Sequence, residues 1–338
     1  MNAKLGSVAS KDRPLLNVSG LHLGFGTDKG RVHVLRDVGV SVPAGEVVGI
    51  VGESGSGKST LAYTVMGLLP ENADVMQGTI AFEGHDLLKL SPKKRRALRG
   101  HRMSMIFQDP MTALNPVLSI KRQMIDIQHR DPISRQEKRK RAIEMLVKVG
   151  IPDPAARIGG YAHEFSGGMR QRICIAMALL IKPALLIADE PTTALDATLE
   201  VQIIHLLKNL QKEVGCSILF VSHHLGTVAE ICDRVAVMYA GEVIEYGTVR
   251  DIFHSPAHPY TRALLNCDPG RIAKKIRTLP TIPGEVPNLI GVPEGCIFRS
   301  RCPHALDRCA SEHPVARQVN ATQAAKCHLL DAAENLAS

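Results

Sequence analysis

Tryptophan is absent from the sequence, and aromatic residues make up 4% of its 338 positions. Proteins that hold single strands of nucleic acid commonly stack the bases on aromatic side chains, so a large stacking surface is not expected. No apolar run reaches the roughly 18 residues that a membrane-spanning helix needs. Residues 1–13 also lack the apolar centre of a signal peptide. We therefore expect a cytosolic chain that binds no nucleic acid and meets membranes only peripherally.

The cysteine count and the net charge exclude fewer classes of binding partner. Eight cysteines in a cytosolic chain argue against a disulfide framework. The net charge of +8 is compatible with nucleic acid, with a nucleotide or with an anionic membrane surface, and does not choose among them. The densest basic runs, Lys93–Arg96 and Lys138–Arg141, fall in polar segments with helical character. Solvated helix faces are the expected reading of both runs.

A glycine-rich loop is the most specific feature of the sequence. Val47–Val51 is typical of a strand, Leu61–Leu69 is compatible with a helix, and Gly52–Thr60 between them matches G-x-x-x-x-G-K-[ST]. Glycines let the backbone point successive N–H groups inward, where they and the helix start bind phosphate oxygens. Lys58 would hold the β- and γ-phosphates, and Ser59 would offer a hydroxyl to Mg²⁺. The loop predicts a nucleoside triphosphate site rather than a plain connecting turn.

The surrounding pattern predicts an α/β fold. Alternating apolar residues favour strands at Leu15–Leu23 and Val32–Val42, separated by a turn at Gly24–Gly30, whereas residues 91–150 are largely helical around a short strand that begins at Met103. Hairpins are expected at Gly78–Leu87 and Val235–Gly247, helices at Met169–Ile181 and Leu199–Val214, and buried strands at Ala184–Ala188 and Ser217–Val221.

A rise in proline density indicates a domain boundary near Ser255. Nine of the 20 prolines lie beyond that residue, where no long periodic segment follows Leu265. We expect a leader at residues 1–14, a nucleotide-binding domain at 15–255 and a small loop-rich domain at 256–338. Such a domain has little core and usually needs a covalent or metal staple.

Polar residues follow two of the expected buried strands. Asp189 and Glu190 come directly after Ala184–Ala188, and His223 follows Ser217–Val221. Ligands bind at the carboxyl ends of strands in open α/β sheets. Asp189 would hold Mg²⁺ through water and Glu190 would orient and polarise the attacking water. Solvated loop acids and a structural histidine are the alternatives, which the preceding phosphate loop disfavours.

A second helix start and a group of cysteines complete the candidate sites. Ser166 is a good N-cap before a helix that opens with small residues, an anion-binding geometry, although Ser-Gly-Gly is a weak signal by itself. Thiolates in a loop-rich segment suit an iron–sulfur cluster or zinc, and the wide gaps favour [4Fe–4S]. Unlinked cysteines, or a disulfide formed on isolation, are the alternatives. The four cysteines, spaced C-x5-C-x6-C-x17-C, are Cys296, Cys302, Cys309 and Cys327.

These motifs, in this order, resemble the ATP-binding subunits of ABC transporters from about residue 15 to about residue 330. The resemblance implies an ABC-type P-loop ATPase core with antiparallel β and α-helical subdomains. Its ATP-binding residues here would be Phe25, Gly52, Glu53, Ser54, Gly55, Ser56, Gly57, Lys58, Ser59 and Thr60. Its Mg²⁺ site would use Ser59, Gln108 and Asp189, with Gln108, Glu190 and His223 as catalytic residues. Its signature, which contacts the ATP of a second subunit, would be Ser166, Gly167, Gly168 and Gln171, and Ala194-Leu195-Asp196 would form the D-loop.

Two features place the resemblance in the oligopeptide/dipeptide importer branch. His258-Pro259-Tyr260 matches the opening of its C-terminal extension, and the cysteine pattern resembles one that holds a [4Fe–4S] cluster in relatives. The resemblance implies a peripheral subunit on the cytoplasmic face of the inner membrane, with a second, paralogous ATPase, two permeases and an extracytoplasmic peptide-binding protein. Two small departures are His224, where Asp is common, and Phe165, where Leu is common.

Other functions fit the sequence less well. A soluble ABC ATPase of translation or DNA maintenance usually carries tandem cassettes or long coiled-coil insertions, which this chain lacks. A P-loop kinase or GTPase would have no use for the signature, and a non-catalytic subunit would not need Lys58, Asp189, Glu190 and His223 intact. Nickel, glutathione or opine-like cargo remains an alternative to peptides, because permeases and the binding protein select the cargo.

Overall fold

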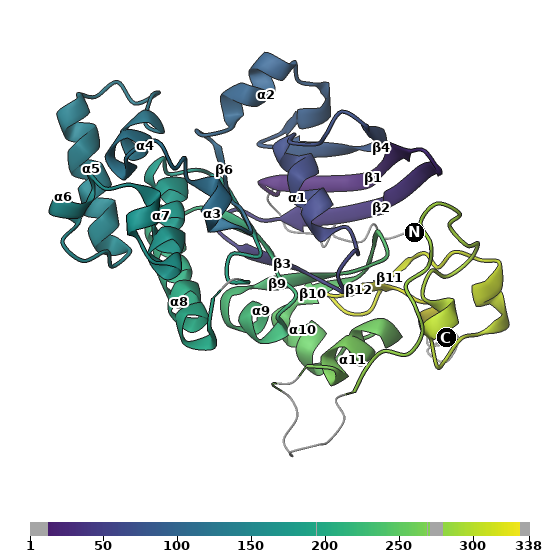
Figure 1. The fold of residues 1–338 in the computed structure, drawn as a ribbon. Helices are drawn as coiled ribbons and strands as arrows, with labels where there is room; N and C mark the ends of the chain where they lie inside the picture. Colours follow the sequence, from purple (N-terminus) through teal and green to yellow (C-terminus); the bar gives the residue numbers. More distant parts are fainter. Residues whose placement is uncertain (1–12, 194, 269, 271–279, 332–338) are drawn as a thin grey trace. The chain divides into compact units, whose positions relative to one another are not determined.

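The computed structural model describes residues 13–193, 195–268, 270 and 280–331. The chain forms two compact units, which are described in turn. Unit 1 consists of Met1–Lys89 and Phe220–Ser338, and unit 2 consists of Leu90–Leu219. The sequence predicts a boundary near residue 255, whereas these units divide the chain near residues 90 and 220. Figure 1 shows the chain coloured from purple at its start to yellow at its end.

An antiparallel sheet forms the first part of unit 1. Its strand order is β2-β1-β4-β5. The strands are β1 (Leu16–Thr27), β2 (Gly30–Val42), β4 (Ala73–Phe82) and β5 (His85–Asp86). The expected strands are confirmed, but the predicted turn at Gly24–Gly30 is wrong for most of its length. Phe25 pairs with Val32 and Thr27 pairs with Gly30, so the hairpin turns at residues 28 and 29. Strand pairing therefore continues through the glycines of this segment.

A second set of strands carries the glycine-rich loop. In unit 1 the strand order is β11-β12-β10-β9-β3. Strand β3 (Val47–Val51), buried along its whole length, runs parallel to β9 (Arg234–Tyr239), which forms the expected hairpin with β10 (Glu242–Thr248). The C-terminal region adds the short strands β11 (Ala316–Gln318) and β12 (Ala324–Lys326), drawn in yellow in Figure 1. Because β12 pairs with β10, this region extends the sheet of unit 1.

The helices of unit 1 are short. They are α1 (Lys58–Met66), α9 (Leu225–Ile231), α10 (Val249–His254) and α11 (Pro259–Asn266), with 3-10 turns η1 (Leu87–Lys89), η4 (Arg299–Arg301), η5 (Asp307–Ala310) and η6 (His328–Leu330). The rings of Tyr239, Tyr260 and Phe298 pack against one another with centroids 4.6 to 5.4 Å apart. All three side chains are buried, so they anchor α11 and the C-terminal region to β9.

Unit 2 is mainly helical around a few buried strands. Strand β6 (Met103–Ile106) runs parallel to β7 (Leu185–Asp189), and the strand order is β8-β7-β6. Strand β8 (Ser217–Val221) begins in unit 2, and its last two residues belong to unit 1. The helices are α2 (Pro92–Leu98), α3 (Pro110–Ala113), α4 (Ile120–Asp126), α5 (Arg135–Lys148), α6 (Pro154–Arg157), α7 (Gly167–Leu180) and α8 (Ala197–Val214), with the 3-10 turn η2 (Ala162–Glu164). None of the helices in the described ranges has both the length and the hydrophobicity of a membrane span.

Candidate active site

The phosphate loop joins β3 to α1 in unit 1, as the sequence predicts. Gly52 and Gly57 have φ angles of 151° and 96°, a region that favours glycine. A Cβ atom on Gly52 would lie 2.0 Å from the carbonyl oxygen of Met238, and one on Gly57 would lie 3.0 Å from that of Val34. Neither position has room for a side chain. The glycines therefore allow the loop to pack directly against neighbouring backbone.

Lys58 lies across this loop and holds its two ends together. Its Nζ atom donates to the carbonyl oxygens of Gly52, at 2.8 Å, and Glu53, at 2.9 Å. The residue is 6% exposed. A buried ammonium needs such acceptors, because an unpaired charge away from water is costly. The predicted phosphate ligand is thus held in place at the first helical position of α1.

The donors of the loop fit a phosphate group. Gly57, the N-cap of α1, has no side chain to accept from the first N–H groups of the helix, so those dipoles face the loop. Ser56 is 2% exposed, and its Oγ atom has no hydrogen-bond partner among the described residues. A buried hydroxyl without a partner is costly unless a ligand or water engages it. Ser59 and Thr60, in the first turn of α1, are partly exposed.

Phe25 and His223 are the other predicted ATP-contacting residues in unit 1. Phe25 lies in β1 and is partly exposed, as a ring that stacks on a base must be. His223 follows β8 and is exposed. The ring of His224 packs edge-on against that of His223, with centroids 4.3 Å apart, and the Ser222 hydroxyl oxygen accepts from the His224 N–H. The unusual His224 therefore braces the predicted catalytic histidine.

Gln108 and Glu190 meet in unit 2. The Oε2 atom of Glu190 accepts hydrogen bonds from Gln108 Nε2, at 3.0 Å, and from Thr193 Oγ1, at 2.9 Å. Strand register explains the meeting, because Ile106 pairs with Ala188 and each polar residue lies two positions beyond its strand partner. Glu190 has a φ of 46°, which is uncommon for a residue other than glycine and turns the chain sharply after β7. Its carboxylate is held at a fixed orientation.

Asp189 and the predicted signature residues Ser166, Gly167 and Gly168 also lie in unit 2. Asp189 ends β7 and is 1% exposed. Ser166 caps α7 by accepting from the N–H of Met169, and Ser166 and Gly167 are exposed. Gly168 is closely packed, since a Cβ there would lie 3.2 Å from Leu199 Cδ1. The start of α7 is therefore exposed at Ser166 and Gly167 and packed against α8 at Gly168.

Gln171 of the predicted signature and Asp196 of the predicted D-loop make hydrogen bonds near the turn between β7 and α8. The buried side chain of Gln171 donates to the carbonyl oxygen of Pro191 at 2.6 Å. Asp196 caps α8 and accepts from the N–H groups of Thr198 and Leu199, both at 3.0 Å. Ala194, in the predicted D-loop, lies outside the described residues. Gln171 and Asp196 therefore make hydrogen bonds that support the local fold, and their predicted contacts with nucleotide stay predictions.

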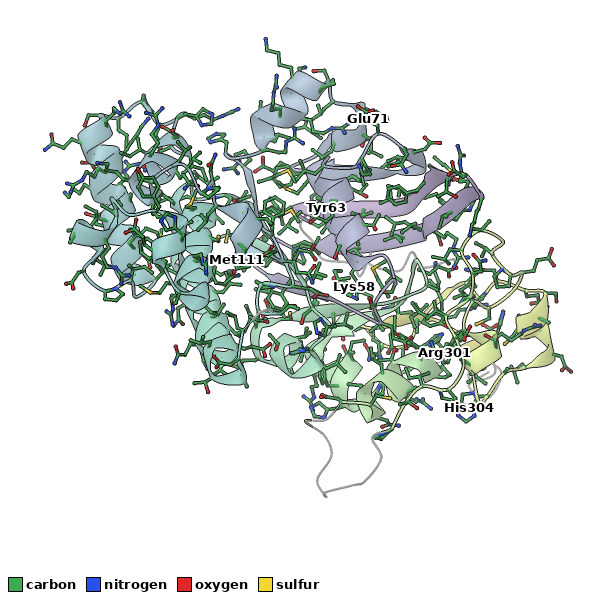
Figure 2. All side chains as sticks on the ribbon, viewed as in Figure 1. Lys58, Tyr63, Glu71, Met111, Arg301 and His304 are labelled. Carbon is green, nitrogen blue, oxygen red and sulfur yellow. The ribbon has the colours of Figure 1, made fainter. Side chains whose placement is uncertain are left out.

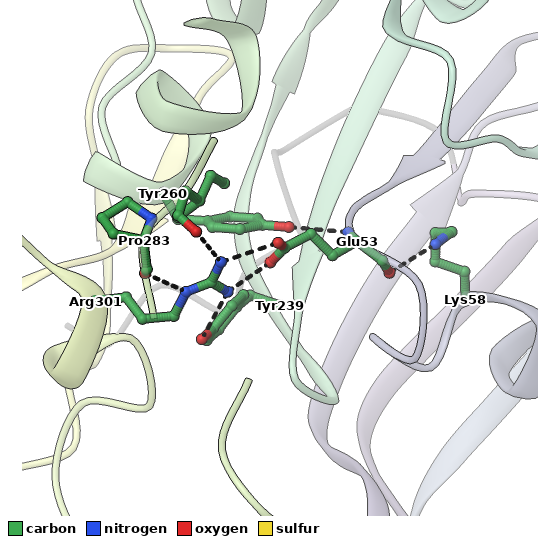
Figure 3. A network of polar contacts seen from close by, with 7 residues as sticks. Glu53, Lys58, Tyr239, Tyr260, Pro283 and Arg301 are labelled. Carbon is green, nitrogen blue, oxygen red and sulfur yellow. Dashed lines mark hydrogen bonds and ion pairs between the residues drawn. The ribbon is translucent and has the colours of Figure 1, made fainter. Parts of the chain in front are cut away.

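One contact of the phosphate loop is not predictable from the sequence. The guanidinium of Arg301 binds both carboxylate oxygens of Glu53, and the Glu53 N–H donates to the hydroxyl oxygen of Tyr260 (Figure 3). Arg301 directly precedes Cys302 and is 248 residues from Glu53. Spacing in the sequence carries no signal for such a pair. The His-Pro-Tyr motif did single out Tyr260, but not this bond.

The four C-terminal cysteines lie in one region of unit 1 but do not form a ready metal site. Burial, with a smaller contribution from the charges of the other three thiols, raises the pKa of the Cys296 thiol to about 12. Burial also raises the pKa of Cys302 and Cys327. Within the described residues no group of three or more His, Cys, Asp or Glu is placed to hold a metal ion. None of the eight cysteines, all of which lie in the described part of the chain, forms a disulfide.

Two family models match the chain. Residues 35–193 match the model described as ABC transporter. Residues 244–309 match the model described as oligopeptide/dipeptide transporter, C-terminal region. The first match covers the phosphate loop and the acidic pair, and the second covers His-Pro-Tyr and three of the four C-terminal cysteines.

Curated relatives match nearly the whole chain. It is 48% identical over 303 residues to the oligopeptide transport ATP-binding protein OppD of Escherichia coli strain K12. The aligned residues cover 89% of this chain and 89% of that protein. It is 46% identical over 320 residues to the dipeptide transport ATP-binding protein DppD of Bacillus subtilis strain 168, which covers 94% of this chain and 95% of that protein.

Solved structures match the ATPase part. One is described as the dimeric structure of a post-hydrolysis state of the ATP-binding cassette MJ0796 bound to ADP and Pi. It is 26% identical, with a TM-score of 0.62, and covers 70% of this chain and 99% of that one. The cbiO1 protein from Clostridium perfringens, part of the ABC transporter complex cbiONQ, is 30% identical with a TM-score of 0.62. These matches confirm the fold class predicted from the sequence.

Proposed function

Because this chain belongs to the family of oligopeptide and dipeptide ABC transporter ATP-binding subunits, we propose that it hydrolyses ATP to drive peptide import through a membrane transporter. The observation that carries the proposal is the combination of a phosphate loop, a paired Gln108 and Glu190, and a C-terminal region of the peptide-transporter type. Neither a kinase nor a GTPase would need the signature helix start or that C-terminal region.

The residue roles follow from the chemistry of phosphoryl transfer to water. Lys58 and the loop N–H groups would bind the β- and γ-phosphates, and Phe25 would stack on the adenine. Ser59, Gln108 and Asp189 would hold Mg²⁺, which neutralises phosphate charge when bound. Glu190, already oriented by Gln108 and Thr193, would accept a proton from the attacking water. His223, braced by His224, would contact the γ-phosphate.

A second ATPase subunit is part of the proposal. The chain has two helix starts suited to phosphate, at α1 and at α7, which exceeds what one triphosphate needs from one chain. We propose that the signature residues Ser166, Gly167, Gly168 and Gln171 contact the ATP of a partner ATPase, a paralogue rather than a second copy. Dimeric forms are described for the similar cassette MJ0796. Binding of ATP would join the subunits and hydrolysis would release them.

An exposed apolar segment between β6 and α4 supports contact with the permeases. Met111 is 56% exposed and Val117 is 77% exposed, and Phe107 and Leu118 are also exposed. Met111, on α3, is labelled in Figure 2. Clustered exposed apolar side chains commonly mark protein contacts. The segment begins beside Gln108, so a permease that binds it would sense the state of the catalytic residues from the cytoplasmic face of the membrane.

Substituting Val117 with glutamate should separate permease binding from ATP binding. We expect more than about a tenfold loss of permease subunits recovered in a mild-detergent pull-down, because a charge would be buried in an apolar contact. Binding of MgATP should stay unchanged. The matched control is Val147→Glu on α5, where the valine is 60% exposed outside this segment. Full recovery of the permeases with Val117→Glu would contradict the docking surface. In the same pull-down with the unmodified chain, recovery of ribosomes or DNA in place of permeases would contradict the importer function.

Peptides are the proposed cargo because the similar curated proteins are named for oligopeptide and dipeptide transport. Nickel, glutathione or opine-like molecules are the alternatives within the same transporter class. Loss of growth on di- and oligopeptides as sole amino-acid source, when the gene is deleted, supports the peptide proposal. Normal peptide uptake in that strain, with loss of nickel or glutathione uptake, would overturn it.

We further propose that Cys296, Cys302, Cys309 and Cys327 hold a [4Fe–4S] cluster, with zinc as the alternative. The donors suit the cluster chemically, and the pKa of Cys296 responds to all three other thiols. Because the described thiols are not placed as a metal site, they would have to converge and ionise on binding. The cluster would staple a region that has little core of its own.

Anaerobic purification tests the cluster directly. We expect broad visible absorbance together with iron and sulfide, and the loss of all three in Cys302→Ser. Cys267→Ser, which changes a free cysteine outside the group of four, is the matched control and should keep them. Zinc without iron would assign the alternative staple. If the fresh protein held neither metal, the four cysteines would not form a metal site.

A further inference from the structure

The guanidinium of Arg301 uses all of its hydrogen-bond donors in one network (Figure 3). An arginine side chain has five N–H groups. Nη1 donates to Glu53 Oε2 at 2.7 Å and to Tyr239 Oη at 3.4 Å. Nη2 donates to Glu53 Oε1 at 3.0 Å and to the carbonyl oxygen of Ile282 at 3.0 Å, and Nε donates to that of Pro283 at 3.0 Å. The site is fitted to a guanidinium, which lysine cannot replace.

The surroundings hold this arginine rigidly. The Arg301 side chain is 3% exposed, whereas the Glu53 side chain is 29% exposed. The guanidinium carbon lies 5.7 Å from the ring centre of Tyr239, and a Cβ on Gly284 would lie 3.1 Å from Arg301 Cγ. The hydrogen bond to Glu53 is the largest of the causes that raise the pKa of Arg301 above its usual value. The guanidinium is therefore fixed in position against the Glu53 carboxylate.

Glu53 is the second residue of the phosphate loop, and its main chain is committed to that loop. Its carbonyl oxygen accepts from Lys58 Nζ, and its N–H donates to the Tyr260 hydroxyl oxygen. A free carboxylate at this point would repel the polyphosphate of MgATP, which also needs Lys58. The bidentate guanidinium of Arg301 offsets that charge. The C-terminal region therefore supplies the counter-charge of the Glu53 carboxylate.

We propose that Arg301 is a positioning residue of the ATPase, which neutralises Glu53 and thereby lets the C-terminal region set the affinity of the phosphate loop for MgATP. The inference rests on the nucleotide site of the proposed function but not on peptides as the cargo. Because Arg301 adjoins Cys302, any change that moves the cysteine segment would also change the contact between Arg301 and Glu53. Arg301 would act on nucleotide affinity and hence on KM, with a smaller effect on kcat.

The test compares how substituting Arg301 and substituting Glu53 each change the affinity for MgATP, because the proposal predicts opposite directions. Arg301→Met exposes the Glu53 charge and should weaken MgATP binding by about tenfold, less so at high salt. Glu53→Gln leaves the guanidinium in place and should bind MgATP at least as tightly as the unmodified protein. The double variant should recover most of the affinity that Arg301→Met loses. Equilibrium binding of a fluorescent ATP analogue, with Mg²⁺ and at two salt concentrations, gives each Kd.

Controls separate charge neutralisation from a purely structural brace. Arg308→Met changes an arginine of the same region that pairs with Glu312 and Asp331, away from the loop, and should leave the Kd unchanged. Thermal unfolding of every variant shows whether it is folded. If Glu53→Gln weakens binding as much as Arg301→Met, or if the double variant shows no recovery, the inference is overturned. Failure of the unmodified protein to bind MgATP would instead overturn the proposed nucleotide site.

Discussion

Replacing Glu190 with glutamine should leave MgATP binding intact while ATP turnover falls by about 10²–10⁴-fold, the usual contribution of a general base. Glutamine keeps the shape of the side chain, and its carbonyl oxygen can still accept from Gln108 Nε2 and Thr193 Oγ1. Its amide cannot take a proton from water. The variant should therefore retain the local structure of the turn after β7 and lose the chemical step.

Single-turnover hydrolysis and nucleotide binding, measured on the same preparation, separate the two effects. Glu144→Gln, which alters an exposed glutamate on α5, is the matched control and should hydrolyse ATP normally. In the presence of the partner ATPase, Glu190→Gln should accumulate an ATP-bound dimer, because hydrolysis no longer releases it. Turnover close to that of the unmodified protein would assign the base elsewhere.

Part of the Gln108–Glu190 contact could be predicted, because the strands that precede these residues have a clear local pattern, whereas a role for Gln108 came only from the family resemblance. Buried apolar runs fix β6 and β7 as strands, and polar residues at their carboxyl ends must then share one edge of the sheet. The sequence could not supply the register that places Gln108 within 3.0 Å of Glu190. Nor could it show that Glu190 takes a left-handed backbone conformation. The register is decided by tertiary structure, which local pattern does not carry.

The errors and omissions have a common physical cause, since long-range contacts override local composition. The glycines at positions 24 and 26 suggested a turn, but pairing with β2 and β4 keeps Gly24 and Phe25 in the strand. Strands β11 and β12 are three residues long each, too short to leave a periodic signal. The Arg301–Glu53 pair joins segments 248 residues apart, and no local rule connects them.

Replacing Lys58 with alanine should abolish measurable binding of MgATP, in contrast to Glu190→Gln. The substitution removes the ammonium that would pair with the phosphates. It also leaves the carbonyl oxygens of Gly52 and Glu53 without the donor that now joins them. Charge-assisted hydrogen bonds contribute about 1.5–3 kcal/mol each, so the loss corresponds to a weakening of about 100-fold or more.

The comparison with a surface lysine isolates the effect of position from that of charge. Lys89→Ala removes a lysine whose side chain is 82% exposed, and it should leave the Kd for MgATP unchanged at moderate salt. Lys58→Arg keeps the charge, but the 6% exposure of this residue leaves little room for a guanidinium, so binding should remain poor. Because nucleotide does not bind, neither Lys58 variant should form the ATP-bound dimer that Glu190→Gln accumulates. Tight MgATP binding by a folded Lys58→Ala protein would mean that the loop amides suffice, and the lysine would then act in the transition state rather than in binding.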